Sequence, residues 1–288
     1  MLTAKITRRD ALRTAAAFAA TALPVRAAAN PLRAAWVNHY IYLTPNLKKT
    51  TDWYEEVFNM RMGIRNVNEA HMWFSDAGNH TCMIVRQAAA GVTATKIVNF
   101  AFTLEHWDEK AVEEELRRRG LNPVADTAKC FRFRDQEGFE IAVCAKDFLK
   151  APSGSPGKPA LWQAVSANHI VELSPSYGKL RDWYKDLLDL RVSYDSGRDV
   201  YMWFGDTVWI PTQTRNGGAN SAALGTLDHV AYTIADFKKD EVEAELKKRN
   251  LNPRLDTDLS FNCVDINGFK TQVCDKQLVP VAEKRPPR

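Results

Sequence analysis

The sequence predicts an α+β protein in which four βαβββ modules pair into two similar half-barrel domains. The first observation is an internal repeat: His39 matches His169 at an offset of 169 − 39 = 130 residues, and Leu121–Pro123 matches Leu251–Pro253 at the same offset. A constant offset between separate landmarks indicates that one structural unit occurs twice. The second observation is that each copy divides again into two segments, each with an alternating strand pattern followed by a helical pattern.

The N-terminal 29 residues belong to neither copy. Basic residues up to Arg13 precede an alanine-rich apolar run at 14–23 and small residues at 27–29, which is the order of segments in a secretory signal. The pair Arg8-Arg9 is typical of the twin-arginine route. We expect a signal peptide over 1–29, a periplasmic location and no membrane span after cleavage, because the apolar run is short. The alternative, an amphipathic helix, is disfavoured because the run has no polar face.

The domain boundaries follow from composition. The first domain is expected at 30–150 and the second at 161–278, joined at 151–160 by a linker rich in Pro, Gly and Ser that suits neither helix nor strand. Residues 279–288 hold several of the chain's prolines and a cluster of basic residues, so we expect a disordered tail there. The sequence leaves open whether the copies pair within one chain or in a homo-oligomer.

Each module is expected to open with a strand, continue with a helix and close with three further strands. The alternating opening strands are predicted at 37–43, 97–104, 168–173 and 227–234. The helices that follow are predicted at 52–58, 110–119, 181–190 and 240–248. Turn signals at 135–138 and 265–268 separate the last two strands of each copy.

The opening strands have two unlike faces. Side chains alternate along a strand, so in 227–234 the large apolar residues share one face and His229, Ala231 and Thr233 share the other. We expect the apolar face to lie beneath the helix and the face with His229 to line a concavity. In the first copy Asn99 takes the place of His229.

Charge and motifs exclude several classes of function. The whole chain carries +4, but the leader alone carries a net +4, so the mature chain is formally neutral and has no nucleic-acid footprint. No Gly-rich phosphate loop, GxGxxG unit or GxSxG elbow is present, which disfavours kinases, nicotinamide enzymes and serine hydrolases. The five cysteines include no CxxC pair, although Cys130 and Cys144 fall nearly opposite each other across the expected hairpin. A bridge there stays open, and buried thiols are the default.

The chain resembles the vicinal oxygen chelate superfamily, which includes glyoxalase I, bleomycin-resistance proteins and type I extradiol dioxygenases. The motifs that carry the resemblance are the histidine of the opening strand, the aromatic pairs Trp53-Tyr54 and Trp183-Tyr184, and the Asp-x-x-Gly hairpins at 135–138 and 265–268. They extend over nearly all of 36–276. Two modules in each of two copies look most like the extradiol arrangement.

The resemblance implies a metal site with ligands from two opening strands and from the residue four after the hairpin glycine. In the second copy these residues are His169, His229 and Gln272, with Fe(II) favoured and Mn or Zn as alternatives. Gln272 departs from the family because a carboxylate is expected there. Asn262 stands where extradiol enzymes tend to place an active-site tyrosine, so we take it as the candidate catalytic residue.

In the first copy the same positions are His39, Asn99 and Ala142, so this copy is expected to be metal-free. A lone strand histidine such as His39 is more often a hydrogen-bonded polar side chain than a ligand. Gln272 has an alternative too, which is to hydrogen-bond a substrate or Asn262. Cys274 is expected to be a buried spectator.

Two further groups have an ordinary structural interpretation. Aromatic residues at alternating strand positions, such as Tyr201 and Phe204, are more often core than pocket. Asp126 and Asp256 recur before the hairpins and suit turns.

Three functions compete. The first is an exported, Fe(II)-dependent dioxygenase of the extradiol type that acts on a catechol-like or other vicinally oxygenated aromatic. The second is a metal-dependent lyase or isomerase of the glyoxalase type. The third is a non-catalytic small-molecule binder of the bleomycin-resistance type, which the neutral side chains of Gln272 and Asn262 favour.

Overall fold

The computed structural model describes residues 30–74, 81–153, 160–205, 207–213 and 226–284. The expected leader at 1–29 and the centre of the expected linker, 154–159, lie outside the described residues. Residues Pro31–Arg288 form one compact unit. The two copies therefore pair within one chain, a point that the sequence left open. No helix in the described segments has the length and apolarity needed to cross a bilayer.

The first copy contains two βαβββ modules, as predicted. The elements of the first module are β1 (Ala34–Thr44), α2 (Leu47–Phe58), β2 (Arg61–Arg65), β3 (Glu69–Trp73) and β4 (Cys82–Gln87). Those of the second are β5 (Lys96–Leu104), α3 (Glu109–Arg118), β6 (Val124–Thr127), β7 (Cys130–Arg134) and β8 (Glu140–Cys144). Helix α2 begins earlier than expected because Asn46 caps it, its side chain accepting a hydrogen bond from Lys49 N.

The second copy repeats this order. Its first module has β9 (Ala164–Ser174), α4 (Tyr177–Leu188), β10 (Arg191–Asp195), β11 (Val200–Phe204) and β12 (Thr207–Gln213). Its second module has β13 (Thr226–Ile234), α5 (Lys239–Lys248), β14 (Arg254–Thr257), β15 (Ser260–Val264) and β16 (Lys270–Cys274). A short helix, α6 (Leu278–Ala282), follows.

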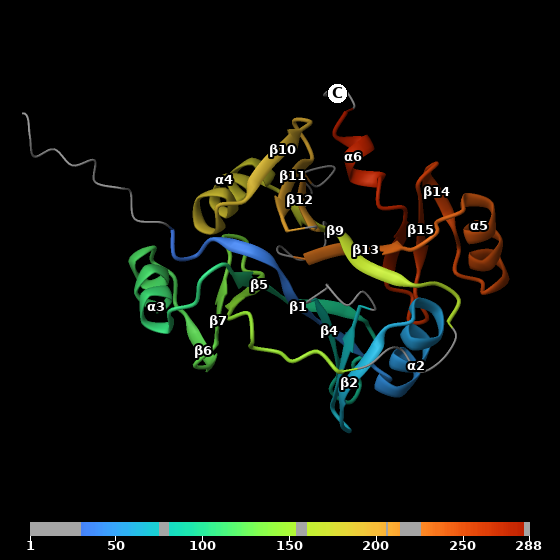
Figure 1. Cartoon of the computed structure of the whole chain (residues 1–288), viewed down its shortest axis with the longest axis horizontal. Coiled ribbons are helices and arrows are strands. Elements are labelled where there is room, and N and C mark those ends of the chain that lie inside the picture. The colour runs from blue at the N-terminus through green and yellow to red at the C-terminus, as the bar shows by residue number, and fades with distance from the viewer. Residues whose placement is uncertain (1–29, 75–80, 154–159, 206, 214–225, 285–288) are drawn as a thin grey trace, which may run out of the picture. The chain divides into compact units, whose positions relative to one another are not determined.

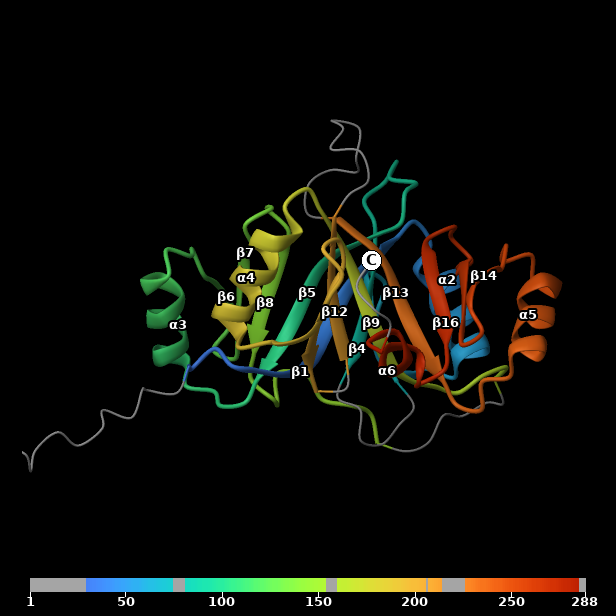
Figure 2. The same cartoon turned by 90° about the horizontal axis from the view of Figure 1, so that it is seen from above.

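The eight strands of each copy form one mixed sheet, which confirms the predicted fold class. The orders are β2-β3-β4-β1-β5-β8-β7-β6 and β10-β11-β12-β9-β13-β16-β15-β14. In the first sheet β1 is antiparallel to β5 and parallel to β4, and β9 stands in the same relation to β13 and β12 in the second. Figure 2 shows the four opening strands in the middle of the molecule, with α3 and α5 at opposite sides.

The apolar faces of the opening strands bury against the other copy as well as beneath the helices. Tyr232 on β13 packs against Phe58 and Phe74 of the first copy, and its hydroxyl lies 3.0 Å from that of Tyr40. Phe102 on β5 packs against Phe204 of β11. We expected the helix of the same module to cover this face alone. The difference arises because two sheets that each expose a broad apolar face remove more area from water by packing together.

The contacts between the copies come in reciprocal pairs. Tyr54 on α2 donates to Asp265 at 3.1 Å, and Tyr184 on α4 donates to Asp135 at 3.0 Å. Tyr54 and Tyr184 occupy equivalent positions in the repeat, and so do Asp135 and Asp265. These two contacts therefore join equivalent surfaces of the two copies, as in a two-fold dimer. Both aspartates also accept backbone N–H groups of their own hairpin turns. One side chain thus shapes the turn and joins the copies.

The prediction of a disordered tail over 279–288 was wrong for residues up to 284. Leu278, Val279 and Ala282 of α6 are buried, and Glu283 accepts hydrogen bonds from Ser193 and Trp203 of the second copy. Figure 1 shows the second sheet lying between the first copy and α6. The apolar spacing of these three residues places them on one side of a helical turn, a signal that the prolines nearby obscured. Residues 285–288 lie outside the described part of the chain.

Candidate functional site

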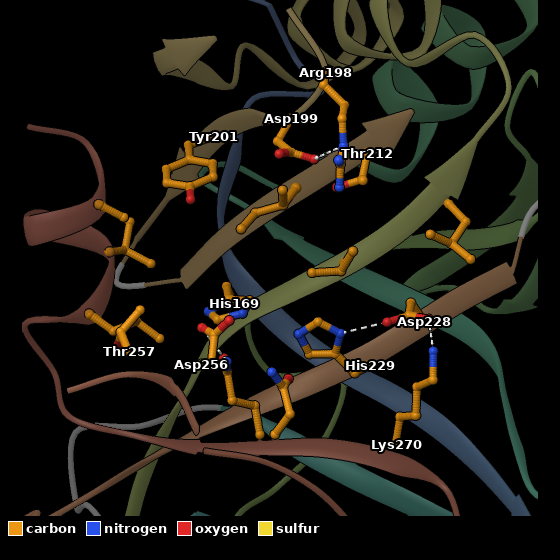
Figure 3. Close-up of a pocket in the computed structure, with 18 of the residues that line it drawn as sticks. His169, Arg198, Asp199, Tyr201, Thr212, Asp228, His229, Asp256, Thr257 and Lys270 are labelled. Atoms are coloured by element: carbon orange, nitrogen blue, oxygen red, sulfur yellow. Dashed lines mark hydrogen bonds and ion pairs between the residues drawn. The ribbon is translucent and has the colours of Figure 1, made fainter. Parts of the chain in front are cut away.

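The strand register brings His169, His229 and Gln272 to one face of the second sheet, here called the cavity face. Ala231 of β13 pairs with His169 of β9 on one side and with Gln272 of β16 on the other. His229 stands two residues before Ala231, so its side chain points to the same face. The rings of His169 and His229 have centroids 5.5 Å apart and are nearly perpendicular. Figure 3 shows the two rings side by side in the cavity.

Each imidazole is held through Nδ1. His169 Nδ1 lies 2.9 Å from Asn168 Oδ1, and the amide nitrogen of Asn168 donates to Thr233 Oγ1 at 3.1 Å. Because that amide donates through nitrogen, its oxygen accepts from the imidazole. His229 Nδ1 lies 2.9 Å from a carboxylate oxygen of Asp228, which can only accept. Both rings therefore donate a proton from Nδ1, as metal-bound histidines do to their outer partners, and this leaves Nε2 as the ring nitrogen available to a ligand.

The electrostatics keep this pair ready to bind a cation. Burial and the neighbouring His229 hold the pKa of His169 well below its ordinary value, so the ring is neutral at physiological pH. Burial alone would raise the pKa of Asp228, but hydrogen bonds from His229 and Lys270 outweigh it and lower the pKa to about 2. Figure 3 shows this Lys270–Asp228–His229 chain. Asp228 thus stays charged behind the ring of His229.

Gln272 has a buried oxygen that requires a partner. Its side chain is 3% exposed, and Nε2 donates to Asp256 Oδ2 at 3.1 Å. Its Oε1 is buried and has no hydrogen-bond partner among the described residues. A buried polar atom without a partner costs free energy unless an ion, water or ligand satisfies it. Asn262 is paired with Gln272 across β15 and β16 and also lines the cavity, as the sequence predicted for the catalytic candidate.

These donors fit a divalent metal ion that is bound without a charged ligand. The two imidazoles and the side-chain amide of Gln272 line one cavity from the same face of the sheet, and nitrogen and oxygen ligands of this kind suit Fe(II), Mn(II) or Zn(II). No cluster of three His, Cys, Asp or Glu side chains occurs within the described ranges, so the third ligand would be neutral. Such a site binds a cation more weakly than a site with a carboxylate ligand.

The cavity over this face has a volume of about 680 Å³, within the range of small-molecule sites. Its walls are largely apolar and are formed by Val171, Leu173, Ile210 and Tyr201. The helix α6 borders part of the cavity through Leu278 and Val279. We expected Tyr201 to be core, and the structure instead places its ring at the cavity (Figure 3). Phe204 is core as expected. Arg198, Arg254 and Lys270 add positive charge at the cavity, balanced by Asp199, Asp228 and Asp256.

The equivalent face of the first copy is filled. His39 is 4% exposed and the ring of Phe148 lies over it, with centroids 5.6 Å apart. Phe148 also covers Ala101 and Ala142, which stand at the positions of Ala231 and Gln272. Burial and the charges of Arg86 and His71 lower the pKa of His39 to about 3. That this copy holds no metal stays a prediction, which the packing supports.

The cysteines behave as apolar side chains. Cys274 lies on the cavity face two residues after Gln272, but it is 0% exposed beneath Ala231 and Leu278. Cys130 and Cys144 are directly paired across β7 and β8, with Sγ atoms 2.9 Å apart. Their facing positions confirm the expected hairpin register. Both are free thiols in this structure, and a bridge between them stays an open alternative to buried thiols.

Sequence reasoning missed the residues that hold the candidate ligands. Asn168 and Asp228 stand directly before the two histidines, and Asp256 was interpreted as a turn former. A signal for the first two was available, because a polar residue preceding each inward histidine is suited to accept from its Nδ1. The sequence carried no such signal for Asp256, which meets Gln272 only through the pairing of β14, β15 and β16.

Comparison with known proteins agrees with this architecture. The Glyoxalase/Bleomycin resistance protein/Dioxygenase superfamily matches residues 36–143, which is most of the first copy. No curated protein matches the chain by sequence. The second copy repeats the strand order of the first, so the fold of this superfamily occurs twice in the chain.

Solved structures of the same fold include a dioxygenase and a metal-bound glyoxalase. A variant of homoprotocatechuate 2,3-dioxygenase from Brevibacterium fuscum aligns with a TM-score of 0.64 at 13% identity, covering 86% of this chain and 73% of that chain. The Mn(II)-bound glyoxalase from Novosphingobium aromaticivorans aligns with a TM-score of 0.63 at 18% identity, covering 85% of this chain and 83% of that chain. At these identities the likeness concerns the fold.

Proposed function

We propose that the second copy holds a divalent metal ion at His169, His229 and Gln272 and acts on a small aromatic ring that carries vicinal oxygens. Extradiol-type ring cleavage with Fe(II) is the reaction we put first. One observation carries the proposal: two imidazoles, each held through Nδ1, line the cavity on the same face as a buried amide oxygen that lacks a partner among the described residues. The fold shared with a dioxygenase and with a Mn(II)-bound glyoxalase supports it.

When bound, the ion would act as a Lewis acid and as a template for the substrate oxygens. The protein's own side chains would do the rest. The apolar walls formed by Val171, Ile210 and Tyr201 would hold the flat ring and exclude water. Asn262 would hydrogen-bond a substrate oxygen, since its amide can donate and accept. Holding the reacting groups in one orientation lowers the activation barrier, because the entropy of bringing them together is lost on binding and not in the reaction step.

Metal analysis is the decisive test. We expect the purified protein to bind one Fe(II) or Mn(II) per chain in an anaerobic calorimetric titration. His229→Ala should weaken that binding by more than the roughly 10–100-fold typical of an outer partner of a ligand. The matched control is Asn99→Ala, the same truncation at the equivalent position of the first copy, which should leave the affinity unchanged. A wild-type protein that takes up neither ion would contradict the proposal.

Oxygen uptake separates the reactions. A dioxygenase should consume dissolved oxygen with a panel of catechols, and the rate should depend on added Fe(II). The glyoxalase-type lyase or isomerase is the second candidate, and the fold shared with a Mn(II)-bound glyoxalase favours it. That enzyme would turn over its substrate under anaerobic conditions. A non-catalytic binder would keep its ligand affinity in the His229→Ala variant.

We also propose that the chain is exported to the periplasm by the twin-arginine route, with the signal over 1–29. The order of basic, apolar and small residues in the sequence supports this proposal. Because that route carries folded proteins, a metal ion loaded in the cytoplasm would travel with the protein.

A further inference from the structure

The orientation of the Gln272 amide depends on a single neighbour. Its Nε2 donates to Asp256 Oδ2 at 3.1 Å, and the same carboxylate oxygen accepts from Ser260 Oγ at 3.1 Å. A carboxylate can accept hydrogen bonds but has no proton to donate, so it attracts the amide nitrogen and repels the amide oxygen. Oε1 is thereby turned away from Asp256 and left without a partner among the described side chains.

We propose that Asp256 is a positioning residue of the metal site, which aims Gln272 Oε1 at the ion and supplies negative charge from one hydrogen bond behind it. This inference rests on the proposed function, since it concerns how the same site holds its ion. Figure 3 shows Asp256 in the cavity beside His169. The sequence had suggested only a turn-forming role for this residue.

The charge balance of the site explains why such a residue is needed. All three candidate ligands are neutral, and a divalent cation in a partly buried site requires nearby negative charge. The carboxylate of Asp228 lies directly behind His229, and that of Asp256 lies directly behind Gln272. The negative charge therefore lies on residues that hydrogen-bond to two of the three ligands. In a site with a carboxylate ligand, that charge would contact the ion directly.

The first copy shows that the turn alone does not account for Asp256. Its counterpart there, Asp126, occupies the same position before the hairpin but pairs with Arg132, at 2.6 Å from Nε to Oδ1. The position of Gln272 is Ala142 in that copy, and that of Arg132 is Asn262 in the second. Both copies thus keep the aspartate near the end of the strand that precedes the turn, β6 in the first copy and β14 in the second. In the second copy, where two histidines line the cavity, the aspartate faces the amide of Gln272. In the first copy, whose equivalent face is filled, it faces Arg132.

The test is a double-mutant cycle on metal affinity in the full chain. We would titrate Mn(II) into wild type, Asp256→Asn, Gln272→Ala and the double variant by calorimetry under anaerobic conditions. Asp256→Asn should weaken binding about 10-fold, at the low end for the loss of an outer partner. In the Gln272→Ala background the same change should have a clearly smaller effect, because the amide that Asp256 aims is absent and only the through-space charge of Asp256 remains. Asp126→Asn is the matched control and should leave the affinity at the wild-type value.

A rescue variant distinguishes positioning from general damage to the turn. Asp256→Asn combined with Gln272→Glu moves the negative charge from the outer residue to the ligand. The amide introduced at position 256 can donate a hydrogen bond to the carboxylate introduced at position 272. This variant should bind Mn(II) at least as tightly as wild type, whereas a variant with a damaged turn would not recover.

The outcomes are separable. If wild type binds Mn(II) and Asp256→Asn binds it equally well, the positioning role is wrong and the proposed metal site stands. The positioning role is also wrong if Asp256→Asn weakens binding equally in both backgrounds, or if the rescue variant stays weak. If wild type binds no metal ion, the metal site and the positioning role fail together.

Discussion

Asp228 gives the sharpest prediction about the charge behind the ligands. Replacement of Asp228 by Asn keeps the shape of the side chain and removes its charge. The amide can still accept from His229 Nδ1, as the natural amide of Asn168 does for His169 at the same 2.9 Å distance. Lys270 would lose its 2.7 Å ion pair. The variant thus isolates the effect of the charge from that of ring orientation.

The magnitude follows from the pKa of this carboxyl. Burial opposes the charged form, yet the hydrogen bonds from His229 and Lys270 bring the pKa from 3.8 to about 2. At about 1.36 kcal/mol per pH unit this corresponds to at most about 2 kcal/mol of stability. The side chain is partly exposed, so screening by water reduces the contribution to about 1 kcal/mol. We expect a tenfold loss of Mn(II) affinity, or about 1.4 kcal/mol, in addition.

The sign of the pH dependence is fixed by the lowered pKa. Asp228 stabilises the folded state fully above its unfolded pKa of about 4, and the contribution disappears as the pH falls through about 2. Urea unfolding of the metal-free protein should therefore show wild type about 1 kcal/mol more stable than Asp228→Asn at pH 7, with the gap closing towards pH 2. Calorimetry with Mn(II) at pH 7 measures the affinity.

The control is Asp147→Asn, which removes the same charge from an exposed pair with Lys129 in the first copy. It should change neither the unfolding curve nor the affinity appreciably. The reasoning would be refuted by a stability gap between wild type and Asp228→Asn that is equal at pH 7 and pH 3. It would be refuted equally by unchanged Mn(II) affinity in a variant that is otherwise folded.

Three further predictions test other parts of the structure. Truncation of Phe148 to Ala should open the filled face of the first copy at a cost of about 2–3 kcal/mol in unfolding free energy, less than for a fully buried ring; an unchanged urea midpoint would show that this ring is not packed there. Tyr184→Phe should cost about 1.5–2 kcal/mol, because it removes a donor from the buried Asp135; Tyr54→Phe should cost less, because Asp265 still accepts from Tyr42, and equal losses in urea denaturation would contradict this difference. Replacement of Arg8 and Arg9 by Lys should leave the precursor in the cytoplasm, and processed protein in the periplasmic fraction would count against twin-arginine export.

Much of the fold was predictable because each copy of the repeat carries the same short sequence patterns of strands, helices and turns. Alternating residues in strands such as β13 and the turn glycines Gly138 and Gly268, both at positive φ, are properties of short segments. The boundaries of α2 and α4 were less accurate, since the first turn of α2 is mostly polar and that of α4 contains Gly178, so both look like loops in the sequence. The helix α6 was missed because its burial depends on a distant sheet.

The inward-facing positions of His169 and His229 could be predicted from strand alternation and the repeat offset, whereas Gln272 was named from the resemblance to the vicinal oxygen chelate superfamily. The sequence could not determine which residues hydrogen-bond to these side chains or which residues cover them. Asp256 reaches Gln272 across two strand pairings, and Phe148 fills one cavity while α6 only borders the other. Local patterns determine strands and faces, since they depend on neighbours along the chain. Partners brought together by packing are decided only when the sheets assemble, because those contacts join residues far apart in the sequence.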